Sequence, residues 1–550
     1  MATKERWGTR LGLVLAMAGN AVGLGNFLRF PAQAAKNGGG AFMIPYIVAL
    51  IVMGLPLMWV EWTLGRYGGQ FGHHSAPGIL QSTARGRGWK YFGVFGIWAN
   101  LIIAAFYVYI ESWCLAYAGF SAIGGFRDTP AKEFYNNLIG ASENNIFSIS
   151  IWGMGVFAVC IVLNVFILSR GLARGIETVA KIGMPILILF AAILAVRGLM
   201  SQVGDEGVVE SPFVGLNFVW EPKLDSLANP AVWLAAAGQI FFTLSIGIGS
   251  IHCYSSYLRA KDDIALTGAT TAWTNEFCEV VLGGTVLIPI AVAYLGLSHV
   301  ADPETSGFAL GFLSFPTLFQ KWGWLAAPAG FLWFGLLFVA AITSSLAMGQ
   351  PIMAFLQDEY GFDRKRSALA FGGMLLLLAV PVAIFEQKSF FDEFDFWGGT
   401  FALVVFAFGE SILFGWVFGM DKAWAEMNRG AELKIPSIFY YFIKYLTPVF
   451  LFFILAGSIF QPKAGWDAYS NALFKGEEMP AWEWSGSGVI GKILHKDIED
   501  SSDPQKQAFN EDLKLVRTID RLVLVGVFLF FSVLVYFAWK RRAAEGRLAT

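Results

Sequence analysis

The first long apolar segment, residues 11–30, is interrupted at its centre by residues that disfavour a continuous helix. Three glycines and two asparagines fall within the eight residues 19–26. Both residue types lower helix propensity, and glycine readily adopts backbone angles that open a helix. Inside a bilayer, the freed N–H and C=O groups must be satisfied by protein, water or a bound ligand. The interruption therefore predicts a ligand site near the middle of the membrane.

A second apolar segment carries a matching interruption at residues 239–250. The apolar run is broken there by Gln239, Thr243, Ser245, Gly247, Gly249 and Ser250. Paired interrupted segments in corresponding positions of two halves are the sequence signature of a transporter site at a repeat interface. We therefore predict an all-α polytopic membrane protein that contains a 5+5 inverted repeat. The first repeat is expected over residues 11–199 and the second over residues 231–418, with helices 1 and 6 unwound at mid-membrane.

Charged residues make up only 15% of the 550 residues, against about 25% in a typical soluble domain. The apolar runs predict about twelve spans, near residues 11–35, 41–66, 90–123, 147–168, 175–199, 231–257, 264–297, 326–356, 367–385, 396–418, 437–460 and 518–539. Basic residues gather in alternate loops and place both termini in the cytoplasm by the positive-inside rule. The remaining parts are a cytoplasmic segment 1–10, an extracellular insert 461–514 and a cytoplasmic tail 540–550.

Several function classes are excluded by the composition and the motifs. The net charge of −2 gives no basic excess for binding nucleic acid. The four cysteines show no metal-ligand spacing, and the sequence contains no phosphate-binding loop, HExxH motif or GxSxG motif. We expect a protein that is not an enzyme and that draws on an ion gradient.

Neutral polar residues interrupt the apolar spans at Asn26, Thr243, Asn275, Thr343 and Ser344. Singly, each could simply bond a neighbouring helix. Together with freed carbonyls they form an oxygen cage without carboxylates, which suits a monovalent cation.

Ionisable residues at membrane depth are read as functional by default, and here they are Arg29, Glu61, Glu111, Glu279, Asp395 and Glu410. Arg29 and Asp395 are expected near the external boundary, as a pair across a vestibule or as a purely structural pair. Glu279 follows Asn275 by one helical turn, so its charge would assist a cation site. His73 and His74 are expected to be solvated in a cytoplasmic loop.

Several motifs resemble those of the neurotransmitter:sodium symporter family. They are residues 20–31 (NAVGLGNFLRFP), 36–42 (KNGGGAF), 238–245 (GQIFFTLS), 343–345 (TSS) and 395–397 (DFW). The similarity covers nearly the whole chain outside the insert and is closest to the bacterial amino acid transporters. It implies a LeuT-like fold, sodium as the cofactor at two sites, and an amino acid as the substrate.

The resemblance also implies binding roles for individual residues. The substrate site would consist of Ala21, Leu24, Gly25, Ile103, Tyr107, Phe242, Thr243, Ser245, Ile248, Ser344 and Met348. One sodium ion would be held by Ala21, Asn26, Thr243 and Asn275, and the other by Gly19, Val22, Ala340, Thr343 and Ser344.

Further implied roles concern gating and chloride. Tyr107 and Phe242 would cover the substrate, Arg29 and Asp395 would form an outer gate, and the inner closure would use Lys4, Trp7, Tyr257 and Asp358. Glu279 occupies the position where chloride-independent members carry a carboxylate in place of chloride. We therefore expect chloride-independent transport.

The expected function is sodium-coupled import of a neutral apolar amino acid by alternating access. The apolar pocket wall favours leucine or methionine, with aromatic amino acids as the alternative, because burying an unpaired charge is costly. A sensor that binds sodium and amino acid without transport is the rival from another class. The expected partners are the substrate and the lipid bilayer, a homodimer is left open, and the expected location is the plasma membrane, in bacteria the inner membrane.

Overall fold

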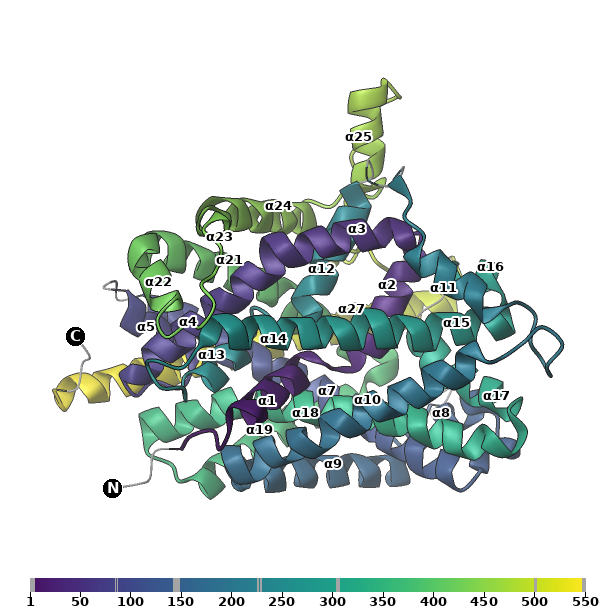
Figure 1. The fold of residues 1–550 in the computed structure, drawn as a ribbon, viewed down its shortest axis with the longest axis horizontal. Coiled ribbons are helices and arrows are strands. Elements are labelled where there is room, and N and C mark those ends of the chain that lie inside the picture. The colour runs from purple at the N-terminus through teal and green to yellow at the C-terminus, as the bar shows by residue number, and fades with distance from the viewer. Residues whose placement is uncertain are drawn as a thin grey trace.

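The protein is described by a computed structural model that covers residues 5–84, 86, 88–141, 149–224, 227, 230–302, 307–498 and 502–546. Within this part the chain is helical, with two isolated β-bridges and no sheet. Most helices run along the long axis of the molecule, and both ends of the chain lie at the same end of the bundle (Figure 1). This arrangement confirms the all-helical membrane fold.

The twelve spans expected from the sequence correspond, in the described part of the chain, to ten continuous apolar segments, one bent pair and one further broken segment. Ten segments of the described chain are long and apolar enough to cross a bilayer, and a bent pair makes an eleventh. The sixth span consists of two short helices, α12 and α13, separated by a break. In chain order the spans are α1 (Arg10–Ala21) with η1 (Gly25–Arg29) and α2 (Phe30–Lys36); α3 (Gly40–Ala49), η2 (Leu50–Gly54) and α4 (Leu55–Gln70); α6 (Trp89–Phe92) and α7 (Phe95–Ala122); α9 (Ile151–Ser169); η4 (Leu172–Ile176) and α10 (Glu177–Leu199); α12 (Pro230–Thr243) and α13 (Ser250–Ser255); α14 (Ile264–Glu276), η6 (Phe277–Gly283) and α15 (Gly284–Leu295); α18 (Ala326–Tyr360); α19 (Arg364–Ile384); α20 (Phe390–Phe396), η10 (Trp397–Phe401), α21 (Ala402–Ile412), η11 (Leu413–Gly419) and α22 (Met420–Met427); α23 (Ile438–Tyr441), η12 (Phe442–Leu446) and α24 (Thr447–Ile459); and α27 (Pro504–Ala544).

Shorter helices occupy the connections between spans. They are α5 (Ala76–Thr83), η3 (Gly125–Arg127), α8 (Ala131–Ile139), α11 (Pro212–Trp220), α16 (Leu297–Val300), η7 (Ala309–Ser314), α17 (Phe315–Gln320), η8 (Gly323–Leu325), η9 (Glu386–Lys388), α25 (Gly465–Lys475) and α26 (Val489–Ile493).

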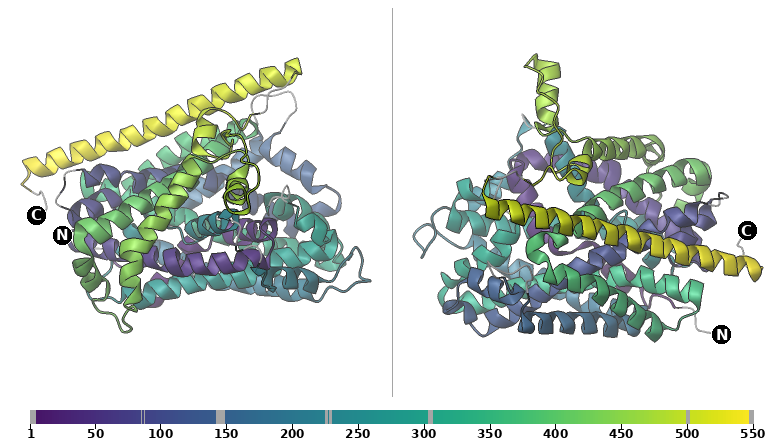
Figure 2. Two further views of the ribbon diagram at one scale, coloured as in Figure 1. Left: turned by 90° about the horizontal axis from the view of Figure 1, so that it is seen from above. Right: turned by 180° about the vertical axis from the view of Figure 1, so that it is seen from behind.

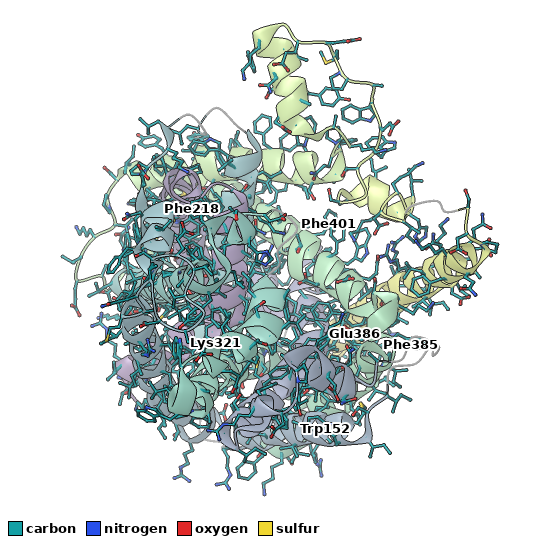
Figure 3. All side chains as sticks on the ribbon, turned by 90° about the vertical axis from the view of Figure 1, so that its right-hand side faces the viewer. Trp152, Phe218, Lys321, Phe385, Glu386 and Phe401 are labelled. Carbon is teal, nitrogen blue, oxygen red and sulfur yellow. The ribbon has the colours of Figure 1, made fainter. Side chains whose placement is uncertain are left out.

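The centre of the bundle is built from α7 and α18, which pack more extensively on each other than any other pair. Nearly all of α7 is buried, whereas α9, α24 and α27 leave most of their apolar side chains at least partly exposed. Trp152 on α9, for example, is 44% exposed and lies at the periphery of the bundle (Figure 3). The four cysteines, Cys114, Cys160, Cys253 and Cys278, are free and buried. Exposed apolar helices therefore surround a core that also holds polar residues.

The last helix is longer than the sequence suggests. A twelfth span was expected at residues 518–539, but α27 begins at Pro504, inside the expected insert 461–514. Asp503 caps it by accepting a hydrogen bond from the Gln505 N–H, and proline at the first helical position favours a helix start. α27 runs along the outside of the bundle, and α25 projects away from it (Figures 1 and 2).

Candidate functional site

The first span opens at residues 22–24, between α1 and η1. The two halves are bent by 51°. Two backbone donors freed by the break find side-chain acceptors: the Gly23 N–H donates to Asn26 Oδ1 at 2.8 Å, and the Leu24 N–H donates to the Tyr107 hydroxyl at 2.9 Å. The break thus presents backbone polar groups to α7, as the glycine-rich sequence predicts.

The sixth span opens at residues 244–249, between α12 and α13. Gly247 and Gly249 have φ values of 77° and 90°, which side chains other than glycine rarely adopt. A Cβ at Gly247 would also lie 2.3 Å from the Leu403 carbonyl oxygen. The Ser245 hydroxyl donates to the Asn20 carbonyl at 2.9 Å and so connects the two breaks.

A cavity of about 30 Å³ lies between the two breaks, α7, α18 and the tenth span. All of the substrate residues expected from the sequence line it except Leu24, which lines the neighbouring outer cavity. Sequence reasoning missed four further lining residues, Asn20, Gly23, Gly399 and Leu403. Asn20 and Gly23 belong to the first glycine-rich interruption, whereas Gly399 and Leu403 follow the DFW motif without any signal of their own.

The first candidate cation site brings together side chains from three spans. Asn26 Nδ2 donates to Asn275 Oδ1 at 2.9 Å and to Thr243 Oγ1 at 3.2 Å. It also donates to Glu279 Oε2 at 3.0 Å, while Gln239 Nε2 donates to Glu279 Oε1 at 2.8 Å. All five side chains are buried. Gln239 was not assigned a role from sequence, although it stands four residues before Thr243 and hence on the same helix face.

The second candidate cation site lies between α1 and α18. The Ser344 hydroxyl donates to the carbonyls of Gly19 and Ala340, both at 3.1 Å, and the Thr343 hydroxyl lies 3.2 Å from the Ala340 carbonyl. A Cβ at Gly19 would lie 3.0 Å from Thr343 Cβ, so glycine permits this close approach. Val22 follows directly after α1 in extended conformation. Neutral hydroxyl and carbonyl oxygens of this kind suit a monovalent cation.

The outer side of the site has a cavity of about 260 Å³ bordered by Arg29, Asp395, Tyr107 and Phe242. Tyr107 and Phe242 line both cavities and therefore separate them. The Arg29 guanidinium carbon lies 4.2 Å from the centre of the Phe242 ring, a cation–π contact. No ion pair joins Arg29 to Asp395 in this described region, so in this structure Arg29 contacts the ring.

The inner side contains partners that differ from those expected. Trp7 Nε1 donates to the Tyr254 carbonyl at 3.0 Å, and the Tyr257 hydroxyl accepts from Gln350 Nε2 at 2.9 Å. Asp358 accepts from the His74 backbone N–H at 2.7 Å and lies 3.1 Å from His74 Nδ1. Lys4, the partner expected for this closure, lies outside the described residues.

The two adjacent histidines are not the solvated side chains that were expected. His74 stacks on Tyr257 with ring centres 4.5 Å apart. His73 is buried beside Trp539 of α27, and this burial lowers its pKa to about 4. The loop position suggested exposure, but the last helix, distant in sequence, covers it.

A second inner contact was also missed. Arg364 pairs with Glu5 at 2.9 Å and donates to Gln350 Oε1 at 2.7 Å. Since Gln350 donates in turn to Tyr257, these residues connect the N-terminal segment with α18 and the residues after α13. Arg364 belongs to a run of three basic residues, 364–366, in a loop whose charge predicts only that it lies in the cytoplasm.

The comparisons with known proteins agree with this geometry. The sequence model of the sodium:neurotransmitter symporter family matches residues 4–129 and 124–485. An uncharacterized sodium-dependent transporter of Methanocaldococcus jannaschii is 29% identical over 460 residues, which cover 82% of this chain and 89% of the relative. The sodium-dependent nutrient amino acid transporter 1 of Drosophila grimshawi is 25% identical over 591 residues, covering 94% and 90%.

Among solved structures, the crystal structure of MhsT in complex with L-phenylalanine superimposes with a TM-score of 0.70 and 27% identity. The match covers 82% of this chain and 99% of MhsT. It confirms the LeuT-like fold expected from the paired interruptions. A family match over most of the chain, sodium-dependent relatives and a shared transporter fold lead to one conclusion: this multi-pass membrane protein is a transporter, not an enzyme, and belongs to the sodium:neurotransmitter symporter family.

Proposed function

We propose that the protein imports a neutral apolar amino acid together with two sodium ions by alternating access. The observation that carries the proposal is the meeting of both helix breaks around one cavity, with the Asn26, Thr243 and Asn275 side chains beside it. A substrate carboxylate placed there would complete the coordination of the first ion. Each ligand would then raise the affinity of the other reciprocally.

The wall of the cavity supports an apolar substrate. The cavity is lined by the uncharged side chains of Ile103, Ile248 and Met348. A polar substrate side chain would therefore find no charged partner among them. Leucine or methionine is the first candidate substrate, because the flexible Met348 side chain in the cavity wall can adapt to the shape of the bound side chain. The phenylalanine bound in MhsT supports an aromatic substrate as the second candidate.

The ion gradient provides sufficient driving force for concentrative uptake. Two sodium ions crossing about 100 mV contribute about 4.6 kcal/mol. Tenfold concentration gradients add about 1.4 kcal/mol for each ion. The resulting total of about 7 kcal/mol supports an amino acid ratio of roughly 10⁵.

Chloride is not required in this proposal. Glu279 is buried next to Asn26 and accepts hydrogen bonds from Asn26 and Gln239. When ionised, it supplies beside the first cation site the negative charge that a chloride ion would otherwise bring.

The test is uptake of labelled neutral amino acids into proteoliposomes with an inward sodium gradient. Potassium replaces sodium in one control, and gluconate replaces chloride in another. We expect sodium-dependent accumulation of one or a few apolar amino acids, unchanged without chloride. Sodium-dependent binding without any flux would instead support the sensor.

A further inference from the structure

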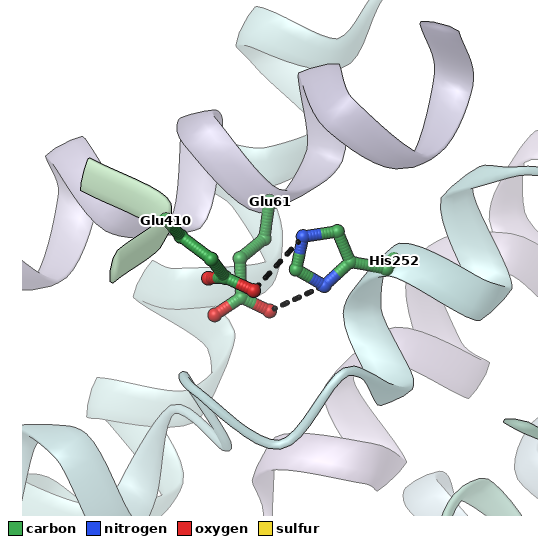
Figure 4. Close-up of side chains that lie close together, drawn as sticks. All are labelled: Glu61, His252 and Glu410. Atoms are coloured by element: carbon green, nitrogen blue, oxygen red, sulfur yellow. Dashed lines mark ion pairs between the residues drawn. The ribbon is translucent and has the colours of Figure 1, made fainter. Parts of the chain in front are cut away.

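Three ionisable side chains, Glu61, His252 and Glu410, form a cluster (Figure 4), and none of them lines the substrate cavity. They come from α4, α13 and α21, and each is completely buried. His252 Nδ1 lies 3.5 Å from Glu61 Oε2, and His252 Nε2 lies 3.2 Å from Glu410 Oε1. The imidazole ring is therefore placed between two carboxyl groups.

The facing atoms of this cluster have no other partners. Within the described residues no hydrogen-bond partner is found for Glu61 Oε2, for either Glu410 carboxyl oxygen or for either His252 ring nitrogen, so their mutual contacts are ion-pair distances. The Phe406 ring lies edge-on to the imidazole at 5.9 Å, which adds an apolar wall. Groups of this kind are costly to bury unless protons shared among them satisfy their polar atoms.

The charges on the neighbouring elements are engaged elsewhere. α5, α24, η10 and η11 carry no charged side chain. The other packed elements contribute Arg66 with Glu426, Glu111 with Asn164, Glu276 with Tyr46, Asp358 with His74, Glu359 with Arg542, Arg10 with Glu432, Asp421 with Tyr440, Lys422 with Tyr67, Lys444 beside Tyr445, and the Tyr254 ring against Trp7. The ionisation of the three residues is therefore set mainly by the three residues themselves.

The geometry points to a proton-binding site formed by Glu61, His252 and Glu410, which holds one exchangeable proton and releases it to the cytoplasm when the inner side opens. With two protons shared among the three groups the cluster has a net charge of −1, and with three it is neutral. The neutral form suits a site in which all three side chains are completely buried, whereas the anionic form requires water. The exchanged proton passes between the cluster and cytoplasmic water, and no other reactant is needed.

A metal ion fits this arrangement less well. The three ligand atoms lie within 4.8 Å of one another. However, His252 turns a different ring nitrogen to each carboxyl group, and an ion held by both carboxylates would use only one nitrogen. A proton shared between each ring nitrogen and the carboxyl group that it faces would use both nitrogens.

The cluster is coupled to the part of the chain expected to move. Glu61 Oε1 accepts a hydrogen bond of 2.6 Å from the Gly247 N–H, in the break of the sixth span. His252 lies on α13, whose Tyr254 carbonyl accepts from Trp7 in the inner closure. Release of Trp7 would free α13 and expose the cluster to cytoplasmic water.

The order of these events fixes the direction of the pH effect. Before the inner side opens, the buried proton cannot exchange, so internal pH does not affect opening. After opening, an alkaline interior removes the proton, and closure must then dehydrate an anion, which is unfavourable. The return of the transporter to its outward-facing state therefore slows. Uptake over many turnovers falls as internal pH rises, with the pH dependence of a single titrating proton.

The experiment rests on the proposed function and uses proteoliposomes with fixed external pH and internal pH varied from about 6 to about 8. The variants are His252→Gln and Glu410→Gln, and the matched control is Glu111→Gln, another fully buried membrane glutamate, bonded to Asn164 and Ser345. Wild type and Glu111→Gln should lose uptake as the interior becomes alkaline. The two cluster variants should lose this dependence on internal pH. In a second series, with internal pH fixed and external pH varied, they should respond as wild type does.

Two outcomes would overturn the proton site. One is a flat internal-pH profile for wild type, which is decisive even where a variant fails to fold. The other is a zinc ion retained stoichiometrically by wild type and lost from His252→Gln, as measured by elemental analysis. Sodium-dependent amino acid binding in detergent, measured in parallel, separates failure of the proton site from failure of the symporter proposal.

Discussion

Gly25 follows the first helix break directly and lies against the Phe242 ring of α12. A Cβ at this position would lie 2.4 Å from the Phe242 ring, so Gly25→Ala must displace the ring from Arg29. We expect sodium-dependent amino acid binding to weaken about tenfold or more, because overpacking costs about 1–3 kcal/mol. Equilibrium binding in detergent measures this. Gly238→Ala, where no atom lies within 4 Å, is the control and should bind normally.

Thr343 tests the second cation site. Thr343→Val keeps the branched shape but removes the hydroxyl beside Ala340 and Gly19. We expect the sodium concentration for half-maximal uptake to rise about tenfold, equivalent to the loss of about 1.4 kcal/mol. Thr271→Val removes a buried hydroxyl that bonds only the Thr267 carbonyl in α14, and should leave sodium activation unchanged. Equal effects in both variants would contradict a sodium role for Thr343.

Among single residues, the sequence predicted those whose residue type differs clearly from that of their neighbours in the chain. Polar residues in apolar runs, such as Asn26, Thr243 and Asn275, do meet in the structure, although their sodium roles remain predictions. His252 gave no comparable signal, since a single histidine in an apolar run does not reveal that Glu61 and Glu410 lie on either side of it. Such contacts depend on how distant helices rotate and pack.

The outer half of α27 is fastened to α20 by an ion pair. Arg521 makes two bonds, of 2.7 and 3.0 Å, to Glu393, whose carboxylate is completely buried. Without Arg521, the buried Glu393 carboxylate keeps only the Trp397 Nε1–H bond and the more distant Arg517, at 3.9 Å, among the partners in the described chain. Arg521→Met should therefore destabilise the protein by about 3 kcal/mol and lower its melting temperature in detergent. Arg541→Met breaks an exposed pair of 3.9 Å to Glu545 and serves as the control. A melting temperature equal to that of the control would contradict this assignment.

The inner half of α27 covers His73, which makes stability depend on pH. The pKa of His73 is about 4 in the folded protein and about 6.5 when unfolded. Between these values the unfolded chain binds more protons, so stability rises with pH and falls on acidification. At about pH 5 the protein should be about 2 kcal/mol less stable than at neutral pH. In His73→Gln, the part of the fall in melting temperature on acidification that comes from His73 should disappear. A fall of equal size in the wild type and the variant would contradict this prediction.

For the whole molecule, the sequence predicted the span count and the two breaks, because bilayer thickness and backbone hydrogen bonding constrain both strongly. The start of α27 was misplaced, since a polar, charged stretch can equally form a loop or a helix that leaves the membrane. The N-cap residue Asp503 is the sequence feature that indicates where this helix begins.

Both termini should lie in the cytoplasm. The sequence predicts an even number of spans, and the two ends of the chain lie at the same end of the bundle (Figure 1). Tags at either terminus should react with an impermeant reagent only after the cell membrane is opened. A tag labelled in intact cells would contradict this topology.

The burial of all four cysteines makes the native chain a ready background for spectroscopic labelling. A thiol reagent that cannot enter the core would react with a newly introduced cysteine alone, for example at Phe474, which is 83% exposed on α25. Pairs of such labels on opposite faces would report the distances between helices in each state of the cycle, without removal of any native cysteine.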